Sequence, residues 1–249
     1  MTDMFLEPDS INYDTFGRAL SDVENGKIII FGIPKSGNVW LQSLLVDYFE
    51  IDPLLTLDEV DRKGVLSIHD PFVDEFKHRS DFVHGVCLIR DMRDIIVSYY
   101  HYAKTDDFRK AMTRHYYDDL DSFYFEWYLS RCVPAHRMMT FADEYAERGI
   151  PVMRYEKLHA DPEGELARLL RRWGVQPDSE RVRMVVENNT LNKLKKEGKN
   201  LGYDIATTHF RKGGSGGWKN ELTPHVIKDI NERFGHYLHR WGYWEDSDS

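Results

Sequence analysis

The feature that most constrains the fold of this chain is the segment from Lys27 to Phe49, KIIIFGIPKSGNVWLQSLLVDYF. It begins with an apolar run, Ile28 to Phe31, whose length and β-branched character are typical of a strand buried on both faces. Two glycines and a proline within residues 32–38 then predict a tight loop. After the loop, apolar residues recur at helical spacing (Trp40, Leu41, Leu44, Leu45, Tyr48). The segment therefore predicts a strand, a glycine-containing loop and a helix, in that order.

This order of elements favours an anion-binding loop. The first turn of a helix leaves backbone N–H groups unpaired and carries partial positive charge, and small residues let an anion approach them. Gly32 and Gly37 keep the spacing of the nucleotide-binding loop G-x-x-x-x-G-K-[ST], but Asn38 and Val39 occupy the positions of its lysine and hydroxyl residue. The lysine is instead Lys35, inside the loop. The missing hydroxyl argues against a Mg-ATP site of the usual kind, and an ordinary turn with a solvated lysine is the alternative.

Length and charge bound the remaining possibilities. At 249 residues, the chain predicts one domain over 1–249, with residues 1–25 and 245–249 peripheral or flexible. Lys and Arg total 33 against 42 Asp and Glu, so no global basic field would recruit nucleic acid and any anion site is local. The distant cysteines Cys87 and Cys132 indicate neither a disulfide framework nor a zinc site. With an acidic N-terminus and no apolar run of membrane-spanning length, we expect a cytoplasmic protein that does not insert into membranes.

The rest of the chain predicts further strands and helices. The run at residues 83–89 predicts a second buried strand, followed directly by Arg90, and polar residues at strand ends are where open parallel sheets bind ligands. Residues 51–80 are irregular and predict connecting structure with short elements, whereas the charged and aromatic residues 104–120 predict an excursion that can serve as a lid. The remaining predictions are a strand at residues 151–155 and helices from Ile95, from Ser122 with a break at Pro134, from Pro162, over residues 179–197 and from Thr223.

Three basic or glycine-rich sites stand out in this acidic chain: Lys35-Ser36-Gly37, Arg90 with Ser98, and Arg211-Lys212-Gly213. In this combination the chain resembles the cytosolic-type sulfotransferases, which use 3′-phosphoadenosine 5′-phosphosulfate (PAPS). Residues 34–40, PKSGNVW, match the family's PKSGTTW loop, and the arginine and serine eight residues apart match its second motif. Residues 211–220 match the third, RKGxxGDWKN. The resemblance implies a three-layer α/β fold with a central, mainly parallel sheet, helices on both faces, and PAPS as the co-substrate without a metal.

The resemblance also implies a nucleotide site. In the family, the residues matching Lys35, Ser36, Gly37, Asn38 and Val39 surround the 5′-phosphosulfate through backbone N–H groups and the lysine. Those matching Arg90, Ser98, Arg211, Lys212 and Gly213 bind the 3′-phosphate. The aromatic residues Trp40 and Tyr155 would flank the adenine, and Leu191 falls near a position that the family often fills with an aromatic residue.

Catalytic roles are implied by the same resemblance. Residues 68–71, IHDP, match the family's TH-x-P sequence, so His69 would take the proton of the acceptor, a step that a neutral imidazole suits. Lys35 would neutralise the departing bridging oxygen, and Ser36 would restrain that lysine until the acceptor binds. His101 and His209 are competing candidates for the base. The product would be adenosine 3′,5′-bisphosphate, and the acceptor a hydroxyl or amine of a small molecule.

The chain departs from the family at three places. Val39 replaces a threonine whose hydroxyl commonly meets the phosphate, Gly217 replaces the aspartate of GDWKN, and residues 219–228 match the dimer motif only in part, which leaves the oligomeric state open. A small-molecule kinase with the same architecture and a nucleotide-binding protein without turnover are the alternative functions. Aromatic residues in the variable segments suggest an apolar or aryl acceptor (Phe72, Phe76, Tyr102, Phe108, Tyr116, Tyr117).

Overall fold

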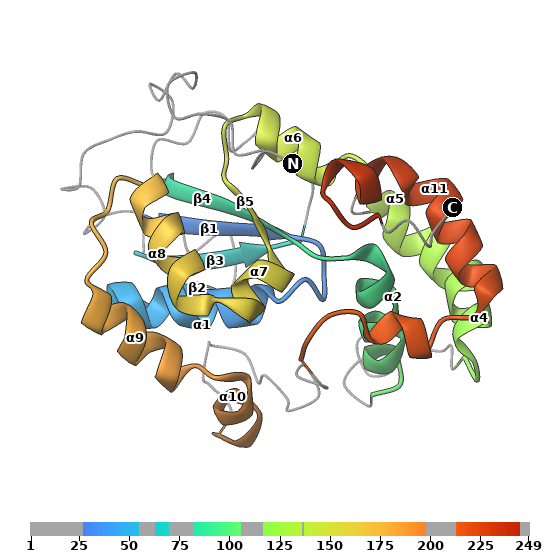
Figure 1. Ribbon diagram of the computed structural model, residues 1–249, viewed down its shortest axis with the longest axis horizontal. Helices are drawn as coiled ribbons and strands as arrows, with labels where there is room; N and C mark the ends of the chain where they lie inside the picture. The colour runs from blue at the N-terminus through green and yellow to red at the C-terminus, as the bar shows by residue number, and fades with distance from the viewer. Residues whose placement is uncertain are drawn as a thin grey trace.

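The central feature of the computed structural model is a parallel β-sheet. The structure describes residues 27–54, 63–69, 82–105, 117–135, 137–197 and 213–244. Every neighbouring pair of strands in the sheet runs parallel (Figure 1). In sheet order the strands are β2 (Pro53–Leu54), β3 (Gly64–Ile68), β1 (Lys27–Gly32), β4 (Phe82–Ile89) and β5 (Val152–Arg154). The carboxyl ends of the strands therefore open at one edge, where a ligand site is expected.

The strands are apolar on both faces because both faces are covered by helices. On β1, Ile28 and Ile30 belong to one buried cluster, whereas Ile29 and Phe31 belong to a second cluster on the opposite face. This alternation results from the two-residue period of a strand. The predicted three-layer α/β fold is therefore present, and the apolar runs of β1 (residues 28–31) and β4 (residues 86–89) reflect burial from two sides.

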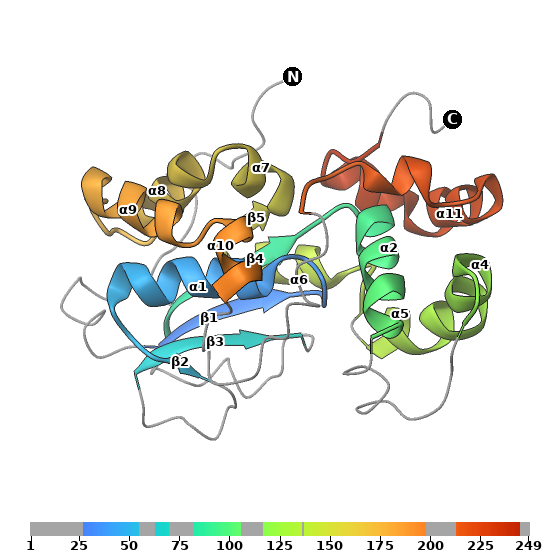
Figure 2. The same ribbon diagram turned by 90° about the horizontal axis from the view of Figure 1, so that it is seen from below.

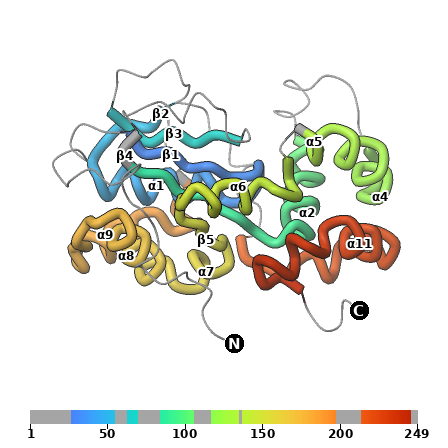
Figure 3. The backbone as a smooth tube through the Cα atoms, turned by 90° about the horizontal axis from the view of Figure 1, so that it is seen from above, coloured from blue at the N-terminus to red at the C-terminus, as the bar shows by residue number. Residues whose placement is uncertain are grey.

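Helices from different parts of the chain cover the two faces (Figures 2 and 3). The first face is covered by α1 (Asn38–Phe49), α7 (Tyr155–Ala160), α8 (Pro162–Arg172), α9 (Ser179–Asn188) and α10 (Leu191–Glu197). The second cluster is formed with α2 (Met92–Ala103), α4 (Leu120–Ser122), the π-helix η5 (Phe123–Cys132), α5 (Val133–Ala135), α6 (Phe141–Glu147), the 3-10 helix η7 (Gly217–Asn220) and α11 (Pro224–Arg240). Figure 3 shows α6 over the sheet and α2, α4, α5 and α11 grouped beyond one end of it.

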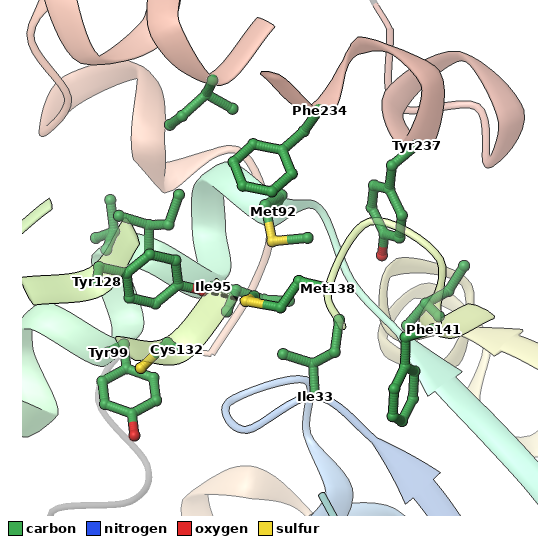
Figure 4. Close-up of a cluster of buried hydrophobic side chains, with 14 of the residues drawn as sticks. Ile33, Met92, Ile95, Tyr99, Tyr128, Cys132, Met138, Phe141, Phe234 and Tyr237 are labelled. Carbon is green, nitrogen blue, oxygen red and sulfur yellow. Dashed lines mark hydrogen bonds between the residues drawn. The ribbon is translucent and has the colours of Figure 1, made fainter. Parts of the chain in front are cut away.

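The second cluster joins segments that are far apart in the sequence. Figure 4 shows Met92 and Ile95 of α2 packed with Tyr128 of η5 and with Phe234 and Tyr237 of α11. All five side chains are buried. Because α2 begins directly after β4, this packing fixes the direction in which the chain leaves the carboxyl end of that strand.

Most predicted elements are confirmed, with four differences. The strand predicted over residues 151–155 is β5, which ends at Arg154, because Tyr155 begins α7. Gly64–Ile68, predicted as part of a connecting segment, is a central strand, because its backbone pairs with β1 and β2 on its two sides. The helix predicted over residues 179–197 is divided into α9 and α10. The helix predicted from Ser122 is largely a π-helix, which continues directly into α5 with Pro134. Within the described ranges, no helix combines the length and apolar character that a membrane span requires.

Candidate functional site

The loop between β1 and α1 passes twice through left-handed backbone conformations. Lys35 has φ 74° and Gly37 has φ 98°, and the N–H of Ser36 donates to the carbonyl of Ile33 at 3.1 Å. Gly37 is required for two reasons, because its φ favours glycine and because a Cβ there would lie 2.6 Å from Cδ2 of Tyr155. The loop shape is thus set locally, with one ring packed against it.

This loop leaves hydrogen-bond donors available at the start of α1. No side chain caps the first turn of α1, so the N–H groups of Asn38 and Val39 are available to a ligand. The hydroxyl of Ser36 is fully buried and has no partner among the described residues. Unpaired N–H groups at the start of a twelve-residue helix, beside an unpaired buried hydroxyl, form a site suited to a phosphate or sulfate.

The side chain of Lys35 reaches across this site towards α2. Its Nζ lies 4.3 Å from the centroid of the Tyr102 ring. Burial, and secondly the positive charge of Arg90, lower the pKa of Lys35 to about 8. The ammonium group is therefore held where its charge is costly, and a bound anion would relieve that cost.

Arg90, at the carboxyl end of β4, connects the first motif to the third. Its two terminal nitrogens donate to the carbonyl of Lys35 at 3.0 Å and to the carbonyl of Gly214 at 2.9 Å. Its guanidinium carbon lies 4.5 Å from the centroid of the Tyr155 ring, and its buried Nε has no partner among the described residues. Arg90 thus brings residues 35 and 214 to one place and keeps one donor for a ligand.

The third motif is held against α2 by Asp94, a residue that the sequence motifs do not include. Its carboxylate accepts the N–H groups of Gly216 at 2.7 Å and of Trp218 at 3.1 Å. A Cβ at Gly217 would lie 3.8 Å from the same carboxylate, so α2 supplies a carboxylate beside the position where the family has an aspartate. The guanidinium of Arg93 lies 4.0 Å from the Trp218 ring centroid. Arg211 and Lys212 lie outside the described residues.

A second layer of hydrogen bonds fixes the backbone at the end of β4. Tyr237 Oη donates to the carbonyl of Arg90 at 2.8 Å. The carboxylate of Glu156 accepts the N–H of Asp91 at 2.9 Å and the hydroxyl of Tyr243 at 3.0 Å. Burial raises the pKa of Glu156 above its usual value. Two tyrosines of the C-terminal segment thus fix the backbone at Arg90 and Asp91. Nothing in the sequence pattern of that segment indicated a role at this site.

His69 lies beside the loop because β3 pairs in parallel with β1, with Ile68 opposite Phe31. Its Nδ1 lies 2.7 Å from the carbonyl oxygen of Gly32 and 3.1 Å from Nδ2 of Asn38, which itself donates to that carbonyl at 3.0 Å. A carbonyl oxygen only accepts hydrogen bonds, so the 2.7 Å contact, the shorter of the two, favours the tautomer with the proton on Nδ1. In the neutral imidazole the lone pair is then on Nε2.

The competing histidines do not share this position. His101 Nε2 lies 2.5 Å from Oε2 of Glu221, where it connects α2 to the residue after η7. His209 lies outside the described residues. Ser98 lies on α2 and is partly exposed, one helical turn from both Asp94 and Tyr102. Of the candidate bases that can be placed, His69 is the one that contacts the loop.

The aromatic side of the site is formed by Trp40 and Tyr155. Both rings are buried, with centroids 6.0 Å apart and planes at 70°. The indole N–H of Trp40 donates to the carbonyl of Asn189 at 2.9 Å, and Asn189 Nδ2 donates to Asp47 at 2.6 Å. Asn189, at the break between α9 and α10, therefore positions Trp40. Leu191 begins α10 two residues later.

Glycine at position 213 is also explained by its surroundings. Gly213 has φ 65°, and a Cβ there would lie 2.6 Å from Cδ1 of Leu191. The third motif therefore passes close to the start of α10, on the same side as Trp40 and Tyr155. Among the described residues, no group of three or more His, Cys, Asp or Glu side chains could hold a metal ion.

Comparisons with known proteins show the family to which the chain belongs. The family model for the sulfotransferase domain matches residues 83–242. Human sulfotransferase 2A1 is 24% identical over 282 residues, covering 94% of this chain and 95% of the human protein. Cytosolic sulfotransferase 3 of Arabidopsis thaliana is 26% identical over 254 residues, covering 86% of this chain and 78% of the plant protein.

Solved structures show the same fold. The crystal structure of mouse sulfotransferase SULT7A1 complexed with PAP is similar with a TM-score of 0.66 at 18% identity, covering 90% of this chain and 87% of the mouse chain. Retinol dehydratase in complex with androsterone and inactive cofactor PAP is similar with a TM-score of 0.63 at 16% identity, covering 90% of this chain and 83% of that chain.

Proposed function

This chain belongs to the sulfotransferase domain family, and from that premise we propose that it transfers the sulfuryl group of PAPS to a hydroxyl or amine of a small-molecule acceptor. The observation that carries the proposal is the position of Arg90. Its guanidinium donates to the carbonyls of Lys35 and Gly214, so the first and third motifs meet at the end of β4. Three motifs that are separate in sequence would then hold one ligand.

The residues present fit the two charged ends of PAPS. At the 5′ end, the N–H groups of Asn38 and Val39 and the buried hydroxyl of Ser36 would bind the phosphosulfate, and Lys35 would add a positive charge. The backbone donors compensate for the missing hydroxyl at Val39. At the 3′ end, Arg90 Nε is a buried donor that still lacks a partner among the described residues.

The remaining nucleotide contacts are assigned from the match of the three motifs to the family. Ser98, Arg211, Lys212 and Gly213 would bind the 3′-phosphate, and Trp40, Tyr155 and Leu191 would enclose the adenine. Lys35, Ser36, Gly37, Asn38 and Val39 would together surround the 5′ end. These assignments are supported by the convergence of the motifs and by the motif match to the family.

Proton removal is assigned to His69. The contact of its Nδ1 with the Gly32 carbonyl favours the tautomer in which Nε2 accepts a proton. As an acceptor oxygen or nitrogen attacks the sulfur, it would pass its proton to Nε2. His69 would then become a cation beside the sulfuryl group and the 5′-phosphate, which are both anionic. Proton transfer by a positioned histidine accelerates reactions by roughly 10²–10⁴-fold.

Lys35 is assigned to the leaving group. As the bond between sulfur and the bridging oxygen breaks, negative charge builds on the 5′-phosphate, and the Lys35 ammonium would neutralise it. The ammonium lies over the ring of Tyr102. Ser36, next in sequence and buried in the loop, would restrain the lysine until the acceptor is bound.

The acceptor is proposed to be apolar. Retinol dehydratase, which shares the fold, is described in complex with retinol and with androsterone, both small apolar molecules. In this chain Tyr102 lies beside Lys35, and Tyr117 packs with Phe123 in the buried cluster beyond α2. Four other aromatic residues suggested by the sequence lie outside the described residues (Phe72, Phe76, Phe108, Tyr116).

A thermal-shift experiment separates this function from a kinase. A ligand at a hundred times its dissociation constant stabilises the folded protein by about 2.7 kcal/mol. We expect adenosine 3′,5′-bisphosphate to stabilise the protein and Mg-ATP to leave it unchanged. Stabilisation by Mg-ATP alone would contradict the proposal.

Turnover separates an enzyme from a binding protein. Labelled PAPS is incubated with a panel of phenols, alcohols and amines, and transfer of the label to at least one acceptor is expected. Binding of the bisphosphate without transfer to any acceptor would favour a nucleotide-binding protein without turnover. The His69→Ala variant tests the base, because full activity in this variant would contradict its assignment.

A further inference from the structure

An exposed imidazole, His159, lies on the aromatic side of the site and belongs to none of the three motifs. It follows Tyr155 by one turn of α7, and the two ring centroids are 5.8 Å apart. The centroid of its ring is also 6.2 Å from that of Trp40. His159 therefore lies at the edge of the two rings proposed to enclose the adenine.

The Nε2 atom of His159 points towards the third motif. It lies 4.0 Å from the position that a Cβ would take on Gly213, while Cδ1 of Leu191 lies 2.6 Å from the same position. Gly213 thus has an apolar side chain on one side and a ring nitrogen close by. Gly213 is also the described residue nearest in sequence to the basic pair at 211 and 212.

The ring nitrogens of His159 are not used by the fold. Its contacts are with the Trp40 and Tyr155 rings, and neither nitrogen has a hydrogen-bonding partner among the residues that the structure describes. Because the side chain is exposed, both nitrogens are open to water or to a ligand that lies beside Gly213. Arg90 packs its guanidinium on the Tyr155 ring, and its buried Nε has no partner among the described residues.

We propose that His159 is a further nucleotide-binding residue, whose Nε2–H donates a hydrogen bond to the 3′-phosphate. The inference rests on the proposed function, because it needs a nucleotide with a 3′-phosphate in the site. His159 then discriminates between nucleotides that carry this phosphate and those that lack it. A hydrogen bond to an ionised phosphate is stronger than one between neutral groups, so its loss is measurable.

The test uses titration calorimetry with two ligands, adenosine 3′,5′-bisphosphate and adenosine 5′-phosphate. The variant His159→Phe keeps an aromatic ring against Trp40 but removes both nitrogens, and His159→Gln keeps a hydrogen-bond donor. We expect His159→Phe to weaken binding of the bisphosphate about tenfold and binding of the monophosphate less than about twofold, with His159→Gln intermediate for the bisphosphate. His236→Phe, an exposed histidine on α11, is the matched control and should bind both ligands normally.

The possible results separate this inference from the proposed function. If the wild-type protein does not bind the bisphosphate, the proposed function fails. If the wild-type protein binds it and His159→Phe weakens both ligands equally, His159 contacts the adenine and not the phosphate, which overturns the inference. Unchanged binding in His159→Phe overturns it as well. Thermal unfolding of each variant without ligand verifies that it is folded.

Discussion

The two ends of the proposed nucleotide site are built in different ways. The 5′ end is one continuous segment, residues 32–40, shaped by the left-handed conformations of Lys35 and Gly37. The 3′ end is assembled from distant segments, since Arg90 and the Gly214 carbonyl that it contacts are separated by 124 positions. A local loop keeps its shape through its own backbone, whereas an assembled site depends on every element that packs behind it. Substitutions should therefore affect chemistry at the first end and nucleotide affinity at the second.

The largest effect is expected for Lys35→Met. This change removes the charge at the leaving group but keeps most of the length of the side chain, and removal of one such group typically costs roughly 10²–10³-fold in kcat. Affinity for adenosine 3′,5′-bisphosphate, which lacks the sulfuryl group, should change by less than about tenfold. Single-turnover kinetics with PAPS and calorimetry with the bisphosphate measure the two quantities.

The control for this variant is Lys104→Met. Lys104 also places its ammonium over a tyrosine ring, at 4.1 Å from the centroid of Tyr100, but outside the loop. Near-normal kcat is expected for this variant. A Lys35→Met protein that kept most of its kcat while losing nucleotide affinity would reverse the assignment of chemistry to the 5′ end.

The next effect concerns the contact between the two ends, where the ring of Tyr155 packs on Gly37. The substitution Gly37→Ala introduces a Cβ 2.6 Å from that ring at a φ of 98°, whereas Gly174→Ala has φ 74° and no atom within 4 Å. The strained backbone costs about 1 kcal/mol of unfolding free energy in both variants, and the collision raises the cost of Gly37→Ala to roughly 3 kcal/mol. Urea unfolding measures the difference, and equal costs would mean that Tyr155 does not constrain the loop.

This contrast also explains which parts could be predicted from the sequence. The strand, loop and helix of the 5′ end were predicted from the sequence, because an apolar run, two glycines and a helical period are local signals. The position of His69 was predicted only through its motif, since the segment before it, Gly64–Ile68, is too short and irregular to indicate a central strand. That strand is defined by pairing with β1, which the sequence of β3 does not encode by itself.

Two supports of the proposed site were not predicted, because each of these contacts involves a backbone group. Asp94 accepts two N–H groups of the third motif, and Asn189 accepts the indole N–H of Trp40 through its carbonyl. Any residue offers an N–H or a carbonyl, so such contacts leave no pattern at the partner position. The local signal is the position of Asp94 in the first turn of α2, four residues after Arg90, and ordinary helix-start carboxylates share that position.

Asp94→Asn tests the assembled end. The amide replaces a charged acceptor of two N–H groups by a neutral one with a single oxygen, and hydrogen bonds to charged groups contribute about 1.5–3 kcal/mol. We expect the affinity for adenosine 3′,5′-bisphosphate to fall roughly tenfold or more while kcat at saturating PAPS changes little. Asp118→Asn removes an exposed carboxylate and should bind normally. Unchanged affinity in Asp94→Asn would mean that the third motif holds its shape without α2.

The smallest effect is a pH dependence confined to the 5′ end. Burial lowers the pKa of Lys35 to about 8 in the ligand-free protein, so the ammonium form, present at lower pH, is lost as pH rises through this value. An anionic ligand binds the charged form, and affinity for the bisphosphate should therefore fall by up to about tenfold between about pH 7 and about pH 9. The ligand phosphates are already ionised above about pH 7 and add little to this change.

The variant Lys35→Arg tests whether Lys35 is the group whose titration changes the affinity. A guanidinium stays charged throughout this range, so calorimetry should show an affinity that is nearly constant with pH in this variant. The buried tyrosines nearest the 3′ end cannot imitate the effect, because burial raises the pKa of Tyr237 and of Tyr243 well above the usual value. If affinity falls with pH equally in both proteins, the titrating group lies outside the loop, and the 5′ end is then no more sensitive to pH than the assembled end.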